Sequence, residues 1–325
     1  MSHELRLGTR GSQLALWQAN AVASAIARSG GPACRVVVIK TSGDTLQDAS
    51  LQQAGGKRLF VKEIEDALLE NEIDLAVHSA KDMPADLPDG LVIAGVLPRE
   101  DPFDAIVLPE GRATTVDRME DLLGILGQTP SLGTSSVRRI AQLKRLIPHG
   151  KFSPIRGNLD TRLRKLDAGE YDALVLASAG LRRLGFASRI SMSVPAAACV
   201  PAPGQGIVAI ETRRDHEAAR RTVRAIHDVE AGIALTVERA LVTALGGGCQ
   251  TPIGALATIT GSDVTLTAAV AALDGTQVVR ASGHAASSEA AGLGIRVARE
   301  LVTCGADAIL ADARRVQSNV TGIQP

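Results

Sequence analysis

The sequence LRLGTRGSQLALWQANAVASAIARSGGPACRVVVIK, residues 5–40, decides the fold class of this chain. Residues 5–10 predict a short strand that ends in a turn, and Ser12 follows as a good N-cap for a helix. The apolar residues of that helix recur at helical spacing: Leu14, Trp17, Ala21 and Ala25, flanked by Val22 and Ile26. The β-branched run at 35–40 is typical of a strand buried on both faces. Strand, helix and strand in this order predict a right-handed crossover into a parallel sheet.

The composition is that of an ordinary globular protein with two or three domains, because the chain has 325 residues and 45% of them are apolar. The 35 basic residues are balanced by 35 acidic ones and only 2% are aromatic, which argues against a general nucleic-acid or membrane binder. Neither a membrane-spanning apolar run nor a signal peptide is expected. The four cysteines form no C-x-x-C pair and have no histidine at ligand spacing, so we expect free thiols, no metal site and a cytoplasmic protein.

The chain after residue 40 predicts two α/β units joined by two crossings. In the first unit, residues 42–58 lack periodicity and predict a long mobile loop. The later strands of this unit are expected at 73–77 and 91–97. A linker leads to the second unit, whose strands are expected at 104–108, 151–155 and 172–177, with a short helix near 117–126. Residues 206–211 predict a strand that could return to the first sheet, so that a cleft separates two lobes.

The pattern changes after residue 254, where strands follow one another without intervening helices. They are expected at 255–260, 264–270 and 278–282, and a helix from about 287 to 304 covers one face. This order predicts a small antiparallel α+β domain. The domain boundaries are then 1–97 together with 207–226, 102–200, and 230–325.

The stretch LGGGCQTPIG, residues 245–254, places a single thiol on a loop. A helical pattern leads into it, three glycines end that helix, and Pro252 stops any further helix. Two interpretations of Cys249 are open at this point. It is either a small buried thiol near a helix end or a thiol that carries chemistry.

Polar residues follow the strand expected at 73–77, where HSAKDMP occupies 78–84. Open α/β sheets place their sites at the carboxyl ends of such strands. Asp82 could stabilise a cationic intermediate or move protons there. The alternative is a structural aspartate that forms the turn before Pro84.

Basic residues gather between Ser135 and Leu166, where Asp160 is the only acid. They are Arg138, Arg139, Lys144, Arg145, Lys151, Arg156, Arg162, Arg164 and Lys165. The hydroxyl-rich turn at 131–136 opens a helix, with Val137, Ile140, Leu143 and Ile147 expected inward, and offers backbone N–H groups to an anion. Because arginine forks match carboxylates, a ligand with several carboxylates is favoured. A solvated helix face and an RNA-binding surface are the alternatives, the latter weakened by the few aromatics.

Six motifs together closely resemble the porphobilinogen deaminase family. They are TRGS with LALWQA at 9–19, HSAKDMP at 78–84, GTSSVRR at 133–139, IRGNLDTRL at 155–163, AGLRRLG at 179–185 and GGCQTPIG at 247–254. The resemblance spans residues 5 to about 255 in order. It implies an α/β fold of two doubly wound lobes, resembling type II periplasmic binding proteins, with a cleft between them. A small C-terminal α+β domain with a three-stranded antiparallel sheet and helices completes that fold.

The resemblance also implies an activity, the head-to-tail condensation of four porphobilinogen molecules with loss of ammonia and hydrolytic release of hydroxymethylbilane. The thiol of Cys249 would carry one covalent dipyrromethane cofactor per chain, and Asp82 would act at the pyrrole nitrogens. The remaining cofactor-binding residues implied are Ser79, Lys81, Thr134, Ser135, Ser136, Arg138, Arg139, Arg162 and Arg183. The substrate-binding residues implied are Arg10, Ser12, Lys57, Phe60, Arg156 and Gln205. Gln53 departs from the family pattern, since a second loop lysine is expected there.

Two other classes of protein remain as rival hypotheses. A non-catalytic ligand-binding protein of the same two-lobed architecture would need neither Cys249 nor Asp82. An RNA-binding protein would lose affinity steeply with salt and form no covalent adduct. For the enzyme we expect porphobilinogen as the small-molecule partner, no nucleic acid, no membrane, and a monomer.

Overall fold

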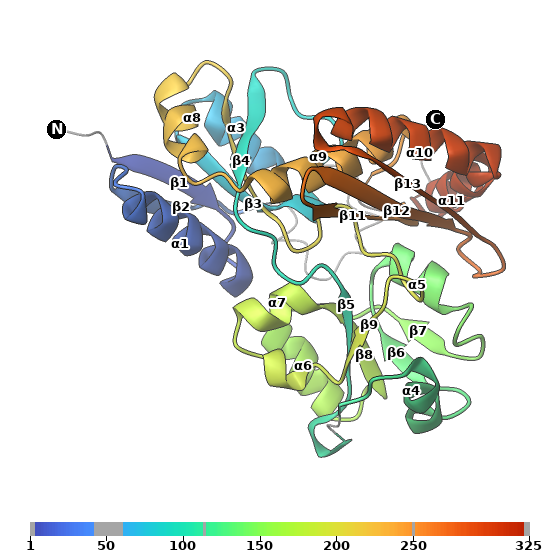
Figure 1. The fold of residues 1–325 in the computed structure, drawn as a ribbon. Coiled ribbons are helices and arrows are strands. Elements are labelled where there is room, and N and C mark those ends of the chain that lie inside the picture. Colours follow the sequence, from blue (N-terminus) through green and yellow to red (C-terminus); the bar gives the residue numbers. More distant parts are fainter. Residues whose placement is uncertain (1–3, 42–60, 113–114, 249–250, 322–325) are drawn as a thin grey trace.

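Three sheets organise the chain, seen in a computed structural model that describes residues 4–41, 61–112, 115–248 and 251–321. Two sheets have five strands and the third has three. In Figure 1 the five-stranded sheets lie one above the other, and the three-stranded sheet lies beside the upper one. No described helix is long and apolar enough to cross a membrane. The three predicted domain ranges each contain one of these sheets, and the domain boundaries themselves stay a prediction.

The first sheet has the strand order β2-β1-β3-β10-β4. Its strands are β1 (Leu5–Thr9), β2 (Cys34–Val38), β3 (Leu75–Ser79), β4 (Leu91–Val96) and β10 (Val208–Arg213). The predicted parallel pairing of the first two strands is confirmed, with Leu5 opposite Cys34. The strand β10 returns from the second crossing and runs antiparallel to both of its neighbours. We call this sheet with its helices α1 (Gln13–Arg28), α3 (Lys62–Leu69) and α8 (Glu217–Arg224) the first lobe.

Helix α1 buries a different face from the one that its most regular apolar spacing marks. Ser12 caps it as predicted, since its hydroxyl accepts from Ala15 N at 3.3 Å. The buried apolar residues are Ala19, Val22 and Ile26, which pack against Leu7, Val77 and Ile210 of the sheet. Trp17 is 39% exposed. The regularly spaced apolar residues therefore lie at the edge of the helix–sheet contact and not at its centre: Leu14, Trp17, Ala21 and Ala25.

The second sheet repeats the arrangement of the first, with the strand order β7-β6-β8-β5-β9. Its strands are β5 (Asp104–Val107), β6 (Ser131–Gly133), β7 (Lys151–Ser153), β8 (Ala173–Ala177) and β9 (Met192–Val194). Here β5 is antiparallel to both neighbours, and it too is the strand that follows a crossing. With the helices α4 (Met119–Leu126), α5 (Val137–Leu143), α6 (Leu159–Asp167) and α7 (Ser178–Arg183), this sheet forms the second lobe.

The third sheet is antiparallel, as predicted, with the order β11-β12-β13. Its strands are β11 (Ile253–Thr260), β12 (Asp263–Ala271) and β13 (Val278–Ala286), and its helices are α9 (Val229–Ala244), α10 (Ala290–Thr303) and α11 (Ala306–Thr321). Short 3₁₀ turns elsewhere in the chain are η1 (Ala80–Asp82), η2 (Glu110–Arg112), η3 (Ala187–Arg189) and η4 (Ser287–Glu289). Helix α11 was not predicted from the sequence; it begins directly after Gly305, where the backbone has φ of 95°.

One buried carboxylate ties both crossings to the third sheet. Glu238 of α9 is fully buried. It accepts from Arg99 Nη1 at 2.6 Å on the first crossing and from Gly204 N at 2.6 Å on the second. It also accepts from Ala257 N of β11 at 2.7 Å. The two lobes are thus joined at a junction that is fixed to the C-terminal sheet.

Candidate functional site

The predicted site residues converge because the carboxyl ends of β1 and β3 in one lobe face those of β6, β7 and β8 in the other. A cavity of about 250 Å³ lies between these edges. Its cationic lining residues come from both lobes: Arg10, Lys81, Arg139 and Arg162. Carboxyl ends of parallel strands, at the point where strand order reverses, are the usual position of ligand sites in such sheets. The structure therefore brings four of the predicted cations together around one space.

Asp82 lies at the edge of this cavity, on the turn η1 that follows β3. Its side chain is exposed. It lines a smaller cavity of about 70 Å³ together with Arg10, Ser12 and His78. Ser79, another predicted residue, lines the same small cavity and accepts from Gln18 Nε2 at 2.8 Å. The hydroxyl of Ser79 is therefore held by helix α1.

Lys81 lies between the large cavity and a third space near the C-terminal sheet, because it lines both. Its ammonium donates to Gln205 Oε1 at 3.5 Å. Burial lowers the pKa of the Lys81 ammonium to about 8, and Arg139 and Arg138 lower it further, while Asp82 and Asp104 act in the opposite direction. A bound carboxylate would raise the pKa of Lys81 again and so keep the ammonium charged at higher pH.

Arg138 and Arg139 are both held by a carboxylate that the sequence analysis did not single out. Asp104, at the start of β5, is fully buried. Arg138 Nη1 donates to Asp104 Oδ2 at 2.7 Å, and Arg139 Nε donates to Oδ1 at 2.9 Å. Gln205 Nε2 donates to the same Oδ1 at 3.0 Å. Burial alone would raise the pKa of Asp104, but the two guanidinium groups and the Gln205 hydrogen bond hold it well below its usual range.

Arg138 makes further contacts that fix it to the second crossing. Its Nη1 donates to Val200 O at 2.8 Å and lies 3.2 Å from Cys199 Sγ. Burial raises the pKa of the Cys199 thiol to about 12, so this cysteine is a neutral neighbour. Arg138 Nε is buried and has no hydrogen-bond partner among the described residues. Both Nη atoms of Arg138 thus already donate to the protein, whereas Nε does not.

This network corrects the expected orientation of α5. Val137 and Ile140 were expected to face inward, but both are only half-buried. The buried residues on that side are Arg138 and Arg139, which are 4% and 7% exposed. The reason is Asp104, whose buried charge requires cationic partners.

The predicted hydroxyl residues build the turn before α5. Ser136 caps the helix by accepting from Arg139 N at 3.4 Å. Ser135 Oγ donates to Ile155 O at 2.8 Å and so joins this turn to the end of β7. Thr134 is 1% exposed, and its Oγ1 accepts from Ser136 N at 3.3 Å. These hydroxyls shape the site edge before any ligand binds.

Three further predicted arginines are placed differently from one another. Arg162 lines the large cavity while its Nε donates to Gly157 O at 2.8 Å, and burial lowers its pKa. Arg183 does not line that cavity; its guanidinium lies 5.3 Å from the ring centroid of Trp17, and its Nη2 donates to Gly206 O at 2.7 Å. Arg156 follows β7 and is half-buried.

Cys249, Lys57 and Phe60 lie outside the described residues. The neighbouring Gly248 lines a space of about 70 Å³ with Lys81, Ser136 and Arg138. This space is bounded by both lobes and by the C-terminal sheet. The described part of the cysteine loop thus borders the same cationic residues.

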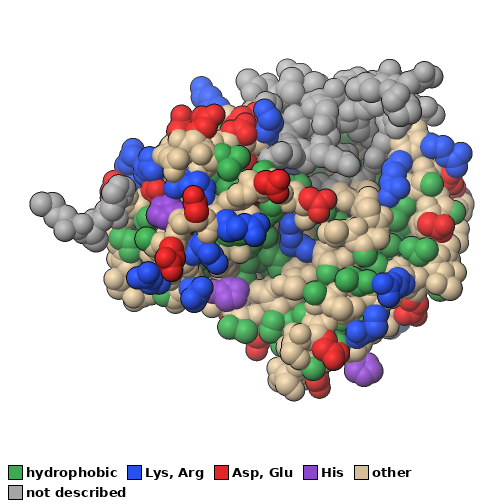
Figure 2. Space-filling model, turned by 90° about the horizontal axis from the view of Figure 1, so that it is seen from above, with side chains coloured by type: hydrophobic (Ala, Val, Ile, Leu, Met, Phe, Trp, Pro, Cys, Tyr) green, Lys and Arg blue, Asp and Glu red, His purple; other side chains and the backbone are tan. Residues whose placement is uncertain are grey.

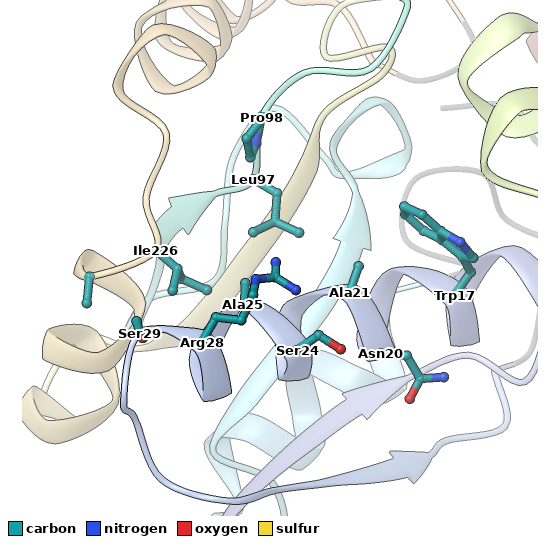
Figure 3. A pocket seen from close by; sticks show the side chains of 11 residues that line it. Trp17, Asn20, Ala21, Ser24, Ala25, Arg28, Ser29, Leu97, Pro98 and Ile226 are labelled. Carbon is teal, nitrogen blue, oxygen red and sulfur yellow. The ribbon is translucent and has the colours of Figure 1, made fainter.

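A wider groove of about 820 Å³ lies elsewhere and contains none of the predicted site residues. Figure 3 shows Trp17, Ala21 and Ala25 of α1 on the side that faces Leu97 and Ile226. On the face seen in Figure 2, basic and acidic side chains are interspersed, with no large patch of one sign. Among the described residues, no group of three or more His, Cys, Asp or Glu side chains is placed to hold a metal ion.

Comparison with known proteins places this geometry in context. A family model described as the porphobilinogen deaminase dipyromethane cofactor binding domain matches residues 5–221, and one for the C-terminal domain matches 233–303. The porphobilinogen deaminase of Geotalea daltonii is 43% identical over 310 residues, covering 95% of this chain and 94% of the relative. That of Syntrophomonas wolfei is 43% identical over 313 residues, covering 96% and 99%.

Solved structures of periplasmic solute-binding folds are also similar, at low sequence identity. The VFT2 domain of Bordetella pertussis BvgS has 17% identity and a TM-score of 0.40, covering 72% of this chain and 91% of that domain. An ancestral arginine-binding protein has 16% identity and a TM-score of 0.36, covering 70% and 92%.

Proposed function

The chain belongs to the porphobilinogen deaminase family, and on that premise we propose that the cavity between its two lobes is where this enzyme's reaction takes place. The activity is the head-to-tail condensation of four porphobilinogen molecules, with loss of ammonia at each step, onto a covalently bound dipyrromethane primer. Hydrolysis then releases hydroxymethylbilane. The observation that carries the site assignment is the convergence of Arg10, Lys81, Arg139 and Arg162 on one cavity with Asp82 at its edge.

The donor set fits a dipyrromethane group, whose two rings bear four carboxylates in all. Lys81, Ser136 and Arg138 surround the space beside the cysteine loop, and Arg138 Nε is a buried donor without a described partner. Ser79, Thr134, Ser135, Arg139, Arg162 and Arg183 complete the proposed cofactor-binding set. When bound, this group supplies a free pyrrole α-carbon to which substrate units are joined. Cys249 would hold it through a thioether, a bond that sulfur forms readily and that survives many turnovers.

The substrate brings an acetate and a propionate on each ring, which arginines recognise through paired N–H donors. We assign Arg10, Ser12, Arg156 and Gln205 to substrate binding, together with Lys57 and Phe60. Burial lowers the pKa of Lys81 to about 8, so the ammonium contributes positive charge to this lining at neutral pH.

Asp82 is the proposed catalytic residue. Loss of ammonia from porphobilinogen leaves a methylene-pyrrolenine cation, and a carboxylate beside the pyrrole N–H stabilises that charge. The same carboxylate can accept the proton that leaves when the new carbon–carbon bond is complete. Its exposure beside the small cavity, which shares Arg10 and Ser12 with the larger one, allows it to reach a ring held by the arginines.

The test is product formation from porphobilinogen by the purified chain and by two cysteine variants. Wild type should release ammonia and a linear tetrapyrrole, both measurable by chromatography. Cys249→Ser should have no covalent cofactor and no turnover. Cys304→Ser is the matched control, because Cys304 is an exposed free thiol on the C-terminal unit. Equal loss in both variants, or full activity of Cys249→Ser, would remove Cys249 from this role.

We also propose that the protein works as a cytoplasmic monomer. The balanced charge and the absence of a membrane-crossing helix among the described residues support this proposal. Size-exclusion chromatography with light scattering measures the mass in solution. A mass near 33.7 kDa is expected, and twice that value would contradict the proposal.

A further inference from the structure

Helix α9 connects the segments that carry the proposed attachment residue and the proposed catalytic residue. It contacts β11 of the C-terminal sheet and β4 of the first lobe (Figure 1). The helix ends at Ala244, and Cys249 follows that end in the sequence. Its first-lobe side meets the connection between η1, which contains Asp82, and β4.

Arg239 of α9 binds the backbone of this connection. Its Nη1 donates to Pro84 O at 2.8 Å, and its Nη2 donates to Ala85 O at 2.6 Å. The guanidinium is planar, so donation from both terminal nitrogens fixes the direction of two successive carbonyl groups. These two residues follow Asp82 closely in the sequence, and the contact therefore limits where its turn can lie.

An apolar contact supports the same turn. Leu235 lies one helical turn before Arg239 and so on the same face of α9. It is buried and belongs to one apolar cluster with Ala80 and Met83. Because Ala80 begins η1 and Met83 follows it, the residues on both sides of Asp82 pack into the cluster that contains Leu235.

The C-terminal end of α9 is fixed as well. Arg314 of α11 donates from Nη2 to Leu245 O at 3.2 Å and to Gly246 O at 3.1 Å. Gly248 and Thr251 are the described ends of the cysteine loop, and Thr251 N donates to Gly248 O at 3.0 Å. The helix that holds the turn of the proposed catalytic residue is thus also held at the start of the cysteine loop.

These segments meet at one space. The cavity of about 70 Å³ beside the cysteine loop is lined by Arg239, by Met83 and Ala85 of the connection, and by Gly248 and Thr251. The proposed reaction takes place between a primer carried by this loop and a carboxylate on that turn. Their relative position therefore depends on the contacts of α9.

We propose that Arg239 is a positioning residue, which sets where the carboxylate of Asp82 lies relative to the primer on Cys249. The inference rests on the proposed function, because the role exists only if these two groups act together. Asp82 lies on a single 3₁₀ turn, where Met83 N donates to Ala80 O at 3.2 Å. A catalytic group displaced by about 1 Å can cost about a hundredfold in rate. Arg239 acts through the backbone of the connection and does not touch the reacting atoms.

The proposal is tested with Arg239→Met in holoenzyme whose covalent cofactor has been verified by intact mass. The kcat should fall about ten- to a hundredfold, whereas KM for porphobilinogen should change by less than about twofold, because in this role Arg239 does not contact substrate. Arg239→Lys, whose ammonium can still donate to one carbonyl, should recover part of the lost kcat. Hydrogen exchange followed by mass spectrometry should show faster exchange in the peptide 80–88 of Arg239→Met.

Arg213→Met is the matched control. Arg213 Nη1 also donates to two backbone carbonyls of the first lobe, Leu68 O at 2.6 Å and Ile73 O at 3.1 Å. These carbonyls lie before β3, whereas Asp82 follows it. Arg213→Met removes the same kind of contact and should leave kcat and the exchange of peptide 80–88 unchanged.

Four results overturn the proposal. They are a kcat of Arg239→Met near that of wild type or no lower than that of Arg213→Met, an increase in KM in place of the decrease in kcat, and unchanged exchange in peptide 80–88. The fourth is an Arg239→Met chain without covalent cofactor, since Arg239 would then serve the attachment of the primer. If wild-type holoenzyme makes no tetrapyrrole, the proposed function fails instead.

Discussion

The two lobes share one strand order but present different chemistry at the edges that face each other. In the first lobe, Asp82 is exposed and burial lowers the pKa of Lys81 to about 8. In the second lobe, Arg138 and Arg139 are buried and fixed by Asp104. Both sheets place a reversed strand in the fourth position, and only the second lobe uses it, at Asp104, to hold arginines. We infer that both lobes supply cations for carboxylates, and that the first lobe adds the exposed carboxylate of Asp82.

The comparison explains why the arginines of one lobe can be rigid. A guanidinium that must recognise carboxylates needs a fixed direction, and a buried carboxylate supplies it. A group that must gain and lose protons needs contact with water and with other titratable groups. In the second lobe Asp104 supplies the fixed direction, whereas in the first lobe Asp82 is exposed to water.

Asp82→Asn is expected to have the largest effect on turnover. Turnover should fall about a thousandfold, because the amide can neither stabilise the substrate cation by charge nor accept its proton. The covalent cofactor should still form. Asp86→Asn, an exposed position on the same connection, is the control and should retain normal turnover. Normal product formation by Asp82→Asn would remove Asp82 from the mechanism.

Asp104→Asn should lower the stability of the protein. Two buried guanidinium groups would lose their counter-charge, and the free energy of unfolding should fall by about 3–5 kcal/mol. Urea unfolding followed by circular dichroism measures the change. Asp167→Asn is the comparison, because its pair with Arg189 is partly exposed and should contribute no more than about 1 kcal/mol. Equal effects of the two substitutions would contradict the central role given to Asp104.

The ionisation of Lys81 should make substrate binding depend on pH. Its pKa is about 8, so the ammonium is charged below neutrality and loses its proton as pH rises through that value. The KM for porphobilinogen should therefore increase severalfold between pH 7 and 9. In Lys81→Arg, whose guanidinium stays charged, KM should be nearly constant across that range. A wild-type KM that does not change would show that Lys81 makes no contact with substrate carboxylates.

The contact between Trp17 and Arg183 should give the smallest effect. It joins α1 of the first lobe to α7 of the second at 5.3 Å. Trp17→Leu should weaken substrate binding about two- to fivefold, since such cation–π contacts are worth roughly 0.5–1 kcal/mol at exposed sites. Trp17→Phe, which keeps a ring, should lose less. Substrate affinity measured by KM separates the two variants, and identical affinities would show that the ring does not position Arg183.

Much of the framework is predictable from local patterns. The strand–helix–strand order at 5–40 and the run of strands after residue 254 depend on periodicity and turn residues that lie within one segment. The reversed directions of β5 and β10 do not, because a strand after a crossing carries no local mark of its orientation. Helix α11 was missed because Gly305 ended the preceding pattern, although Ala306, Ile309 and Leu310 are buried at helical spacing.

In the site, too, some features follow from local sequence patterns and others do not. Hydroxyl-rich turns and basic clusters are visible in the sequence, and Arg10, Lys81, Arg139 and Arg162 do converge. The burial of Arg138 could not be predicted, because its partner Asp104 lies 34 residues away. A signal was present all the same, since Asp104 adjoins and Glu211 follows a run of three apolar strand residues, and a buried acid there needs a partner.

The most direct test of the account is peptide mapping by mass spectrometry of wild-type protein that turns over porphobilinogen. The proposed site predicts one added mass, equal to two linked pyrrole units, on the peptide that contains Cys249. An unmodified Cys249 peptide in active protein, or the same mass on another residue, would contradict the site described here.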